Sequence, residues 1–382
     1  MTPRQVVVFM GTRPEAIKLA PVVAALAAEP GVTCTVVATG QHHEMLRQVT
    51  DQFGIEVAAH LDVMRPDQTL AGLTARLMTG IDDWLAQARP DFALVQGDTT
   101  TVLVAALACF YRRIPIGHVE AGLRTGDIHS PFPEEANRRL ATPLVTLHFA
   151  PTPTAREALL REGVPADAIT MTGNTVIDAL HMETARQREP ALRDAIDREL
   201  GATIGPDWAT VPYVLVTGHR RENFGSGFDE ICAGIARLAE AFPAHRFIYP
   251  VHLNPNVLGP VNRLLGAHPN VRLIPPQNYR QFVALLSHCR LVLTDSGGVQ
   301  EEAPSLGKPI LVMRESTERP EGVAAGTARL VGANADAIVA EATRLLTDAR
   351  AYEAMAAAAN PYGDGLASGR IVERLRRYFD AG

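Results

Sequence analysis

Residues 6–15 read VVVFMGTRPE, an apolar run that leads into a glycine turn and then a proline. A proline fits the first turn of a helix, where its missing N–H needs no partner. This order of buried strand, short turn and helix is the repeating unit of a parallel α/β sheet. Because the same order recurs along the chain, the stretch predicts the fold class of the whole protein.

Five short apolar runs in the first half predict strands buried on both faces, because they do not alternate with polar residues. They are residues 6–9, 35–38, 92–95, 114–119 and 147–150. Helical patterns accompany them at residues 14–28, 44–53, 70–88, 100–112 and 135–144. The first half is therefore expected to form one doubly wound sheet.

The pattern restarts after a polar helical tract at residues 178–200. Further strands are expected at residues 214–217, 247–249, 271–274, 291–294 and 310–312. Two blocks of this kind predict an α/β protein with two doubly wound, Rossmann-like domains. We place the domains at residues 1–174 and 175–365, with a hinge near residues 172–178. The C-terminal helix, residues 366–382, is expected to pack back on the first domain.

Composition excludes several classes of protein. The 382 residues are 47% hydrophobic and 20% charged, with a net charge of -6, which excludes a disordered chain and disfavours a general nucleic-acid binder. The longest apolar run, residues 102–111, is too short to span a bilayer, and residues 6–10 are too few for a signal-peptide core. Four cysteines without metal-ligand spacing indicate thiols in a reducing cytoplasm and no metal site.

Acidic residues follow two neighbouring strands of the first block. Ligands of open α/β sheets bind beyond the carboxyl ends of the strands, where Asp98 and Glu120 stand, and Glu134 begins the next helix. Carboxylates brought together raise one another's pKa, which suits acid–base catalysis. Structural interpretations stay open: Asp98 can cap a helix, and Glu134 or Glu135 can offset a positive helix end.

Basic residues and glycines follow the first strand of each block. Residues 11–18 read GTRPEAIK and include Arg13 and Lys18, while residues 218–223 read GHRREN and include His219. Arginine binds phosphate oxygens in pairs, and a helix N-terminus favours an anion. The alternatives are a tight turn with a surface arginine and a solvated run of charges. Residues 11–18 form neither a GxGxxG nor a Walker motif, so a dinucleotide or ATP site of those types is not supported.

Residues 295–309 read DSGGVQEEAPSLGKP and are the most specific stretch of the chain. Ser296, Gly297 and Gly298 would present backbone N–H groups unhindered by a Cβ, which predicts a seat for a diphosphate. Glu302 lies one turn further on, within reach of ribose hydroxyls. The alternative is a plain glycine turn.

Taken in order, these segments resemble the non-hydrolysing UDP-N-acetylglucosamine 2-epimerases, from residues 11–15 to residues 360–365. The matching motifs are GDTT at 97–100, HVEAGLR at 118–124, PEEANR at 133–138, GNT at 173–175, GHRREN at 218–223 and DSGGVQEE at 295–302. The resemblance implies a GT-B fold, with its two domains facing across a cleft, in a cytoplasmic homodimer. It implies interconversion of UDP-GlcNAc and UDP-ManNAc for surface polysaccharide synthesis, with no cofactor and no nucleic-acid or membrane partner.

The resemblance also implies roles for single residues. UDP would leave to give 2-acetamidoglucal, and would add back after C2 is reprotonated on the opposite face. Asp98, Glu120 and Glu134 match the family's essential carboxylates, which we assign to proton transfer, and His219 matches its essential histidine. The implied substrate-binding residues are Arg13, Lys18, Gln277, Phe282, Ser296, Gly297, Gly298, Glu302 and Arg319. A regulatory UDP-GlcNAc site in many members corresponds here to Gln41, His42, Arg220 and His252.

Three other functions compete with this interpretation. A GT-B glycosyltransferase shares the fold but usually needs a single base, whereas this chain has three acidic segments. A hydrolysing epimerase releases free ManNAc and often carries a kinase domain, for which the chain has no room. A non-catalytic UDP-sugar sensor would not need the full set of carboxylates. The first rival would require an acceptor, so epimerisation of UDP-GlcNAc alone would exclude it.

Overall fold

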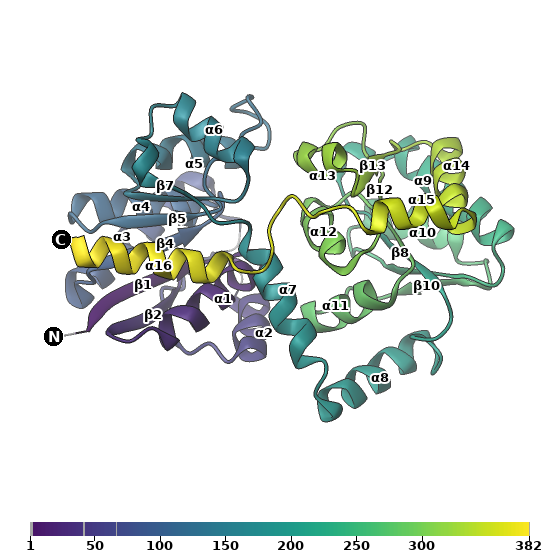
Figure 1. Cartoon of the computed structure of the whole chain (residues 1–382), viewed down its shortest axis with the longest axis horizontal. Coiled ribbons are helices and arrows are strands. Elements are labelled where there is room, and N and C mark those ends of the chain that lie inside the picture. Colours follow the sequence, from purple (N-terminus) through teal and green to yellow (C-terminus); the bar gives the residue numbers. More distant parts are fainter. Residues whose placement is uncertain (1–2, 41–42, 66, 382) are drawn as a thin grey trace. The chain divides into compact units, whose positions relative to one another are not determined.

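The computed structural model describes residues 3–40, 43–65 and 67–381 of the chain (Figure 1). The backbone divides into two compact units. The first unit comprises Met1–Ala179 and Gly363–Gly382, and the second comprises Leu180–Tyr362. The chain passes between the units inside helix α7 and again just after Tyr362.

The described part of the first unit contains a seven-stranded parallel sheet in the order β3-β2-β1-β4-β5-β6-β7. Its strands are β1 (Arg4–Met10), β2 (Val32–Ala38), β3 (Val57–His60), β4 (Phe92–Gln96), β5 (Ile116–Val119), β6 (Leu147–Ala150) and β7 (Ile169–Met171). Its helices are α1 (Arg13–Ala28), α2 (His43–Phe53), α3 (Leu70–Ala88), α4 (Thr100–Tyr111), α5 (Glu134–Ala141), α6 (Pro153–Arg161), the start of α7 (Thr175–Arg186), and α16 (Ala367–Ala381).

The second unit contains a six-stranded parallel sheet in the order β10-β9-β8-β11-β12-β13 among its described residues. Its strands are β8 (Tyr213–Thr217), β9 (Arg246–Pro250), β10 (Val271–Ile274), β11 (Leu291–Thr294), β12 (Ile310–Val312) and β13 (Ala328–Leu330). Its helices are α8 (Pro190–Ile204), α9 (Ser226–Ala241), α10 (Pro255–Leu265), α11 (Tyr279–His288), α12 (Gly297–Glu302), α13 (Pro320–Ala325), α14 (Ala335–Thr347) and α15 (Ala349–Ala356).

The predicted fold class is confirmed, since each unit is a doubly wound parallel sheet. All ten predicted strands are present, and sequence analysis missed β3, β7 and β13. These three are edge strands of three or four residues, with half-exposed side chains, so they lack the continuous apolar run of a central strand.

The polar tract at residues 178–200 is not one helix. Helix α7 ends at Arg186 and α8 begins at Pro190, because a proline is readily accommodated in the first turn of a new helix. Helix α8 also continues past Gly201 to Ile204 and ends before Gly205, whose φ of 127° favours glycine.

Helix α16 is fastened to the first unit at both of its ends. At its start, the buried carboxylate of Asp178 accepts hydrogen bonds from the backbone N–H groups of Ala367 (3.2 Å) and Ser368 (2.8 Å), and from the Ser368 hydroxyl (2.6 Å). At its end, the rings of Tyr378 and Phe379 lie 5.4 and 6.0 Å from the ring of Phe92 in β4. A carboxylate at the N-terminus of a helix also complements the helix dipole.

We predict that Asp178→Ala loosens α16, because three charge-assisted hydrogen bonds are lost together. The free energy of unfolding of the first unit should fall by about 1–3 kcal/mol. Urea unfolding and hydrogen exchange of the α16 amides measure the change. Ser368→Ala is the matched control, since it removes one of the three bonds and should cost less. Equal stability of Asp178→Ala and the unaltered protein would contradict this role.

Candidate active site

Glu120 stands at the carboxyl end of β5 in a conformation that few side chains adopt. Its φ is 64°, in the left-handed region, and it is 7% exposed. Both carboxylate oxygens lie 2.7 Å from the Lys18 ammonium of α1. The side-chain amide of Asn174 donates to Oε1 (3.1 Å), and that of Gln96, the last residue of β4, donates to Oε2. Three other segments of the first unit therefore converge on the Glu120 carboxylate.

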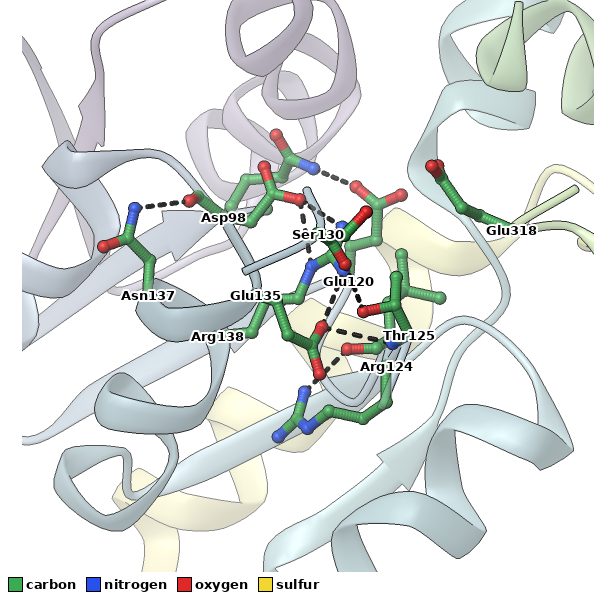
Figure 2. Close-up of polar contacts among 12 residues, drawn as sticks. Asp98, Glu120, Arg124, Thr125, Ser130, Glu135, Asn137, Arg138 and Glu318 are labelled. Atoms are coloured by element: carbon green, nitrogen blue, oxygen red, sulfur yellow. Dashed lines mark hydrogen bonds and ion pairs between the residues drawn. The ribbon is translucent and has the colours of Figure 1, made fainter. Parts of the chain in front are cut away.

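Asp98 lies at the end of the neighbouring strand β4, paired with its own cation. Arg138 of α5 approaches Oδ2 of Asp98 with Nε at 3.0 Å and Nη2 at 2.6 Å (Figure 2). The side-chain amide of Asn137 donates to the backbone carbonyl of Asp98 (2.9 Å). The N-cap position of α4 is Thr99, whose side chain makes no capping hydrogen bond, so the interpretation of Asp98 as the N-cap is wrong.

The two acids that begin α5 differ in their surroundings. Glu135 is fully buried and accepts hydrogen bonds from Arg138 (3.0 Å) and from the backbone N–H of Thr125 (3.2 Å), as Figure 2 shows. Glu134 is half-buried and is the first residue of the helix. The sequence left open which of these two acids has a purely structural role. The buried and hydrogen-bonded Glu135 has the surroundings of a structural residue, and Glu134 stays a predicted site residue.

Glu15 connects the loop after β1 to the loop after β4. It is buried, and it accepts hydrogen bonds from the backbone N–H groups of Gly11 (3.0 Å) and Thr12 (2.6 Å) and from the hydroxyl of Thr99 (2.7 Å). Burial raises the pKa of Glu15, and these hydrogen bonds oppose the rise. Sequence analysis gave Glu15 no role, although residues 12–15 carry the spacing of a capping box. Arg13 follows the N-cap Thr12 and is the first residue of α1.

His118 supports the turn before Asp98. It is 1% exposed in β5, and its Nε2 lies 2.6 Å from the carbonyl oxygen of Gly97, which has a φ of 82°. Burial lowers the pKa of His118 to about 4. At neutral pH the ring is therefore neutral, and Nε2–H donates to the carbonyl.

Asp295 is the buried anion at the carboxyl edge of the second sheet. It follows β11, is fully buried, and accepts hydrogen bonds from the backbone N–H groups of His219 and Arg220, both at 2.8 Å. Its Oδ1 lies 3.6 Å from Nδ1 of His219. The His219 ring also stacks on His252, with 5.5 Å between the ring centroids. Sequence analysis quoted Asp295 but missed this role.

The pKa of His219 is lowered, chiefly because the ring is partly buried. The Asp295 carboxylate raises it in opposition, while Arg220 and His252 lower it further. The net direction favours a neutral imidazole at pH 7. Since Nδ1 faces Asp295, Nε2 is the ring atom that can meet a ligand.

Two guanidinium groups approach Gly297, the first residue of α12. A Cβ added to Gly297 would lie 3.8 Å from Nη2 of Arg220 and 3.9 Å from Cζ of Arg319. Arg319 is in turn paired with Glu301, which is 1% exposed. The N-cap of α12 is Ser296, and Gly298 is its second residue. The second unit thus brings two cations to the predicted diphosphate seat.

The remaining predicted nucleotide residues lie near the start of α11. Glu302 is 6% exposed and accepts a hydrogen bond from the Tyr279 hydroxyl (2.9 Å), which ties α12 to α11. The amide of Gln277 donates to the carbonyl of Pro275 (2.6 Å) in the loop before α11. Phe282 is half-buried in α11 against the core.

The predicted regulatory residues divide into two groups. Gln41 and His42 lie outside the described residues. Arg220 and His252 lie in the second unit next to His219: Arg220 neighbours it in sequence, and His252 stacks on its ring. The structure thus groups two predicted regulatory residues with a predicted catalytic one.

The described residues hold neither a group of metal ligands nor a helix suited to a bilayer. In residues 3–40, 43–65 and 67–381, no three His, Cys, Asp or Glu side chains are grouped as a metal ion would require. None of the helices in this part of the chain combines the length and the apolar character needed to cross a bilayer.

Comparison with known proteins gives full-length matches. The family model described as UDP-N-acetylglucosamine 2-epimerase matches residues 24–376. The UDP-N-acetylglucosamine 2-epimerase of Escherichia coli K12 is 54% identical over 97% of this chain and 98% of its own. A probable UDP-N-acetylglucosamine 2-epimerase of Ralstonia nicotianae is 54% identical over 98% of this chain and all of its own.

Solved structures match over the same length. The UDP-GlcNAc 2-epimerase of Neisseria meningitidis, crystallised with UDP-GlcNAc, is 46% identical, with a TM-score of 0.90 over 98% of this chain and all of that chain. The enzyme of Methanocaldococcus jannaschii, in complex with UDP-GlcNAc and UDP, is 30% identical, with a TM-score of 0.81 over 98% of this chain and 99% of that chain.

The surroundings of His219 generate a prediction with a defined sign. Asp295→Asn removes the negative charge that raises the pKa of His219 but keeps an oxygen for the two backbone N–H groups. The pKa of His219, already lowered by burial, should therefore fall further. NMR titration of the histidine Cε1 protons measures it, with His219→Gln used for assignment. A higher pKa in the variant would show that Asp295 does not act on the ring as described.

Proposed function

The chain belongs to the UDP-N-acetylglucosamine 2-epimerase family, and we propose that it reversibly epimerises UDP-GlcNAc to UDP-ManNAc at C2 of the sugar. The observation that carries the proposal is the pair of carboxylates at the ends of β4 and β5. Asp98 and Glu120 each have a fixed cationic partner and come from adjacent parallel strands. Fixed carboxylates are suited to moving a proton at a carbon atom.

The chemistry of the substrate explains why more than one acid–base group is needed. The C2 proton of the sugar is next to no carbonyl group, so its direct removal would be too slow. If the C1–O bond breaks first, C2–H becomes acidic. We assign proton transfer at C2 to Asp98, Glu120 and Glu134. One group removes the proton as UDP leaves to give 2-acetamidoglucal, and another delivers a proton to the opposite face.

The reaction also requires that the diphosphate of the departing UDP be stabilised. We assign the diphosphate to Arg13, His219, Arg319 and residues 296–298. Support comes from the guanidinium groups beside Gly297 and from a His219 ring whose Nδ1 faces Asp295. Donors fixed before the reaction stabilise a developing charge without reorganisation.

We assign the nucleoside to Glu302, Gln277 and Phe282. The Tyr279 hydroxyl fixes the Glu302 carboxylate, which favours its use as a hydrogen-bond acceptor for ribose. We also assign Lys18 to substrate binding, because its ammonium group lies beside the Glu120 carboxylate. We further propose a cytoplasmic homodimer that supplies precursors of ManNAc-derived polysaccharide, with UDP-GlcNAc as an activator. Sigmoidal kinetics in UDP-GlcNAc would support the activation, and hyperbolic kinetics would exclude it.

We predict that UDP-ManNAc formed from UDP-GlcNAc in D₂O carries deuterium at C2, because the new proton comes from a group that exchanges with solvent. Proton NMR of UDP-GlcNAc with the purified protein and no acceptor measures it, and traces of 2-acetamidoglucal and UDP should accumulate. An ¹⁸O label in the C1–O–P bridge serves as the control for bond cleavage. A label that stays wholly in the bridge during epimerisation would exclude elimination.

We predict that Glu302→Ala weakens UDP binding by about 10- to 150-fold. This fold-change corresponds to the loss of one charge-assisted hydrogen bond, which contributes roughly 1.5–3 kcal/mol. Isothermal titration calorimetry with UDP measures it. Tyr279→Phe is the matched variant, because it removes the hydroxyl that orients Glu302 and keeps the carboxylate, so its effect should be smaller. An unchanged affinity in Glu302→Ala would refute the ribose assignment.

A further inference from the structure

A continuous series of charged groups joins the Thr125 backbone to Asp98. The N–H of Thr125 donates to Glu135, Arg138 donates to the same carboxylate, and the other side of the Arg138 guanidinium contacts Asp98. Exposure of the side chains rises along the series, from 0% for Glu135 to 8% for Arg138 and 29% for Asp98. The inner members are buried, and only the last carboxylate is open to a substrate.

The geometry fixes the orientation of Asp98. Among the described residues, Nε and Nη2 of Arg138 both approach Oδ2, which leaves Oδ1 as the oxygen that can meet a substrate. Asn137, the preceding residue of α5, holds the backbone carbonyl of Asp98. Backbone and side chain are therefore both fixed by one turn of a single helix.

Glu135 fixes Arg138 in turn. The guanidinium plane is held at Nη1 by Glu135 and at Nε and Nη2 by Asp98, so it is clamped on both sides. Burial by itself would lower the pKa of Arg138, but Asp98 and Glu135 outweigh that effect and raise it. Arg138 is therefore a cation at neutral pH.

Five other titratable groups on the described elements around Asp98 do not supply this charge. From β5, His118 is buried and neutral, and Glu120 carries its own partner, Lys18. From α5, Glu134 and Glu135 are acids, and the buried Glu15 reaches the following turn through Thr99. Helix α4 begins with two threonines and presents no charge here.

We propose that Arg138 is a positioning residue for the epimerisation, that it holds Asp98 as a carboxylate with Oδ1 toward the sugar, and that Glu135 fixes Arg138. The proposal rests on the function proposed above. In the direction in which Asp98 acts as the base, the C1–O bond breaks first and its electron pair leaves on UDP. The C2–H bond then breaks, its electron pair forms the C1–C2 double bond, and the proton moves to Oδ1 of Asp98.

The test compares Arg138 with its neighbour on the same helix. Arg138→Met removes the cation beside Asp98, so the acid limb of the kcat/KM profile should move upward by about one pH unit or more. The value of kcat should fall by about 10-fold or more with a smaller change in KM, since the lost orientation matters in the transition state. Arg138→Lys keeps a charge without the planar fork and should restore the acid limb more than kcat.

Arg139→Met is the matched control, because Arg139 is half-exposed and points to Glu162 at 4.0 Å. It should leave both the profile and kcat unchanged. An unshifted acid limb in Arg138→Met, or equal effects of the Arg138 and Arg139 variants, would overturn the proposal. If Arg138→Met does not fold, Glu135→Gln decides: kcat should fall while the acid limb stays or moves downward, and an unchanged kcat would overturn the proposal.

The proposal can fail separately from the proposed function. Carbon-13 NMR of labelled aspartate reports the Asp98 carboxyl directly, with Asp98→Asn for assignment, and needs no turnover. The pKa of this carboxyl should rise in Arg138→Met. A rise in a protein without epimerase activity would support the role of Arg138 and reject the proposed reaction. If the Asp98 pKa is unchanged in Arg138→Met while the unaltered protein is an active epimerase, the role of Arg138 is rejected and the proposed reaction is supported.

Discussion

A buried carboxylate must be paired or hydrogen-bonded, and this requirement organises the carboxyl edge of both sheets. Glu15, Glu120 and Glu135 in the first unit, and Asp295 and Glu301 in the second, are all at most 7% exposed. Their partners are backbone N–H groups, hydroxyls, amides or cations on neighbouring loops, strand ends and helices. Satisfying each buried anion therefore fixes these segments relative to one another within its unit.

The same pairing decides what the exposed groups can do. Lys18 and Arg138 keep two carboxylates fixed at neighbouring strand ends, and Asp295 orients His219 through its backbone and its ring. Sequence analysis expected carboxylates that raise one another's pKa. In the structure, Asp98 contacts Arg138 and Glu120 contacts Lys18, and each cation fixes the orientation of its carboxylate.

The central strands and the carboxylates that follow two of them could be predicted from the sequence, because the residue patterns that indicate them are local. Continuous apolar runs identified the central strands, and the topology of parallel sheets then placed Asp98 and Glu120 at one edge. The partners of these groups could not be predicted in the same way. Lys18 lies 102 residues from Glu120, and Arg138 lies 40 residues from Asp98, so each pair exists only after the sheet has formed. Residues 12–15 did carry a capping-box spacing, but nothing local tied Glu15 to Thr99.

The central claim is that the paired carboxylates transfer protons at the sugar and leave the nucleotide to other residues. It is tested most directly by the rate of C2 epimerisation at saturating UDP-GlcNAc in Asp98→Asn and Glu120→Gln, measured beside UDP affinity. The account predicts that the rate falls by about 10²-fold or more in each variant while UDP affinity stays within about twofold. A near-normal rate in either variant, or a loss of UDP binding as large as the loss of rate, would contradict it.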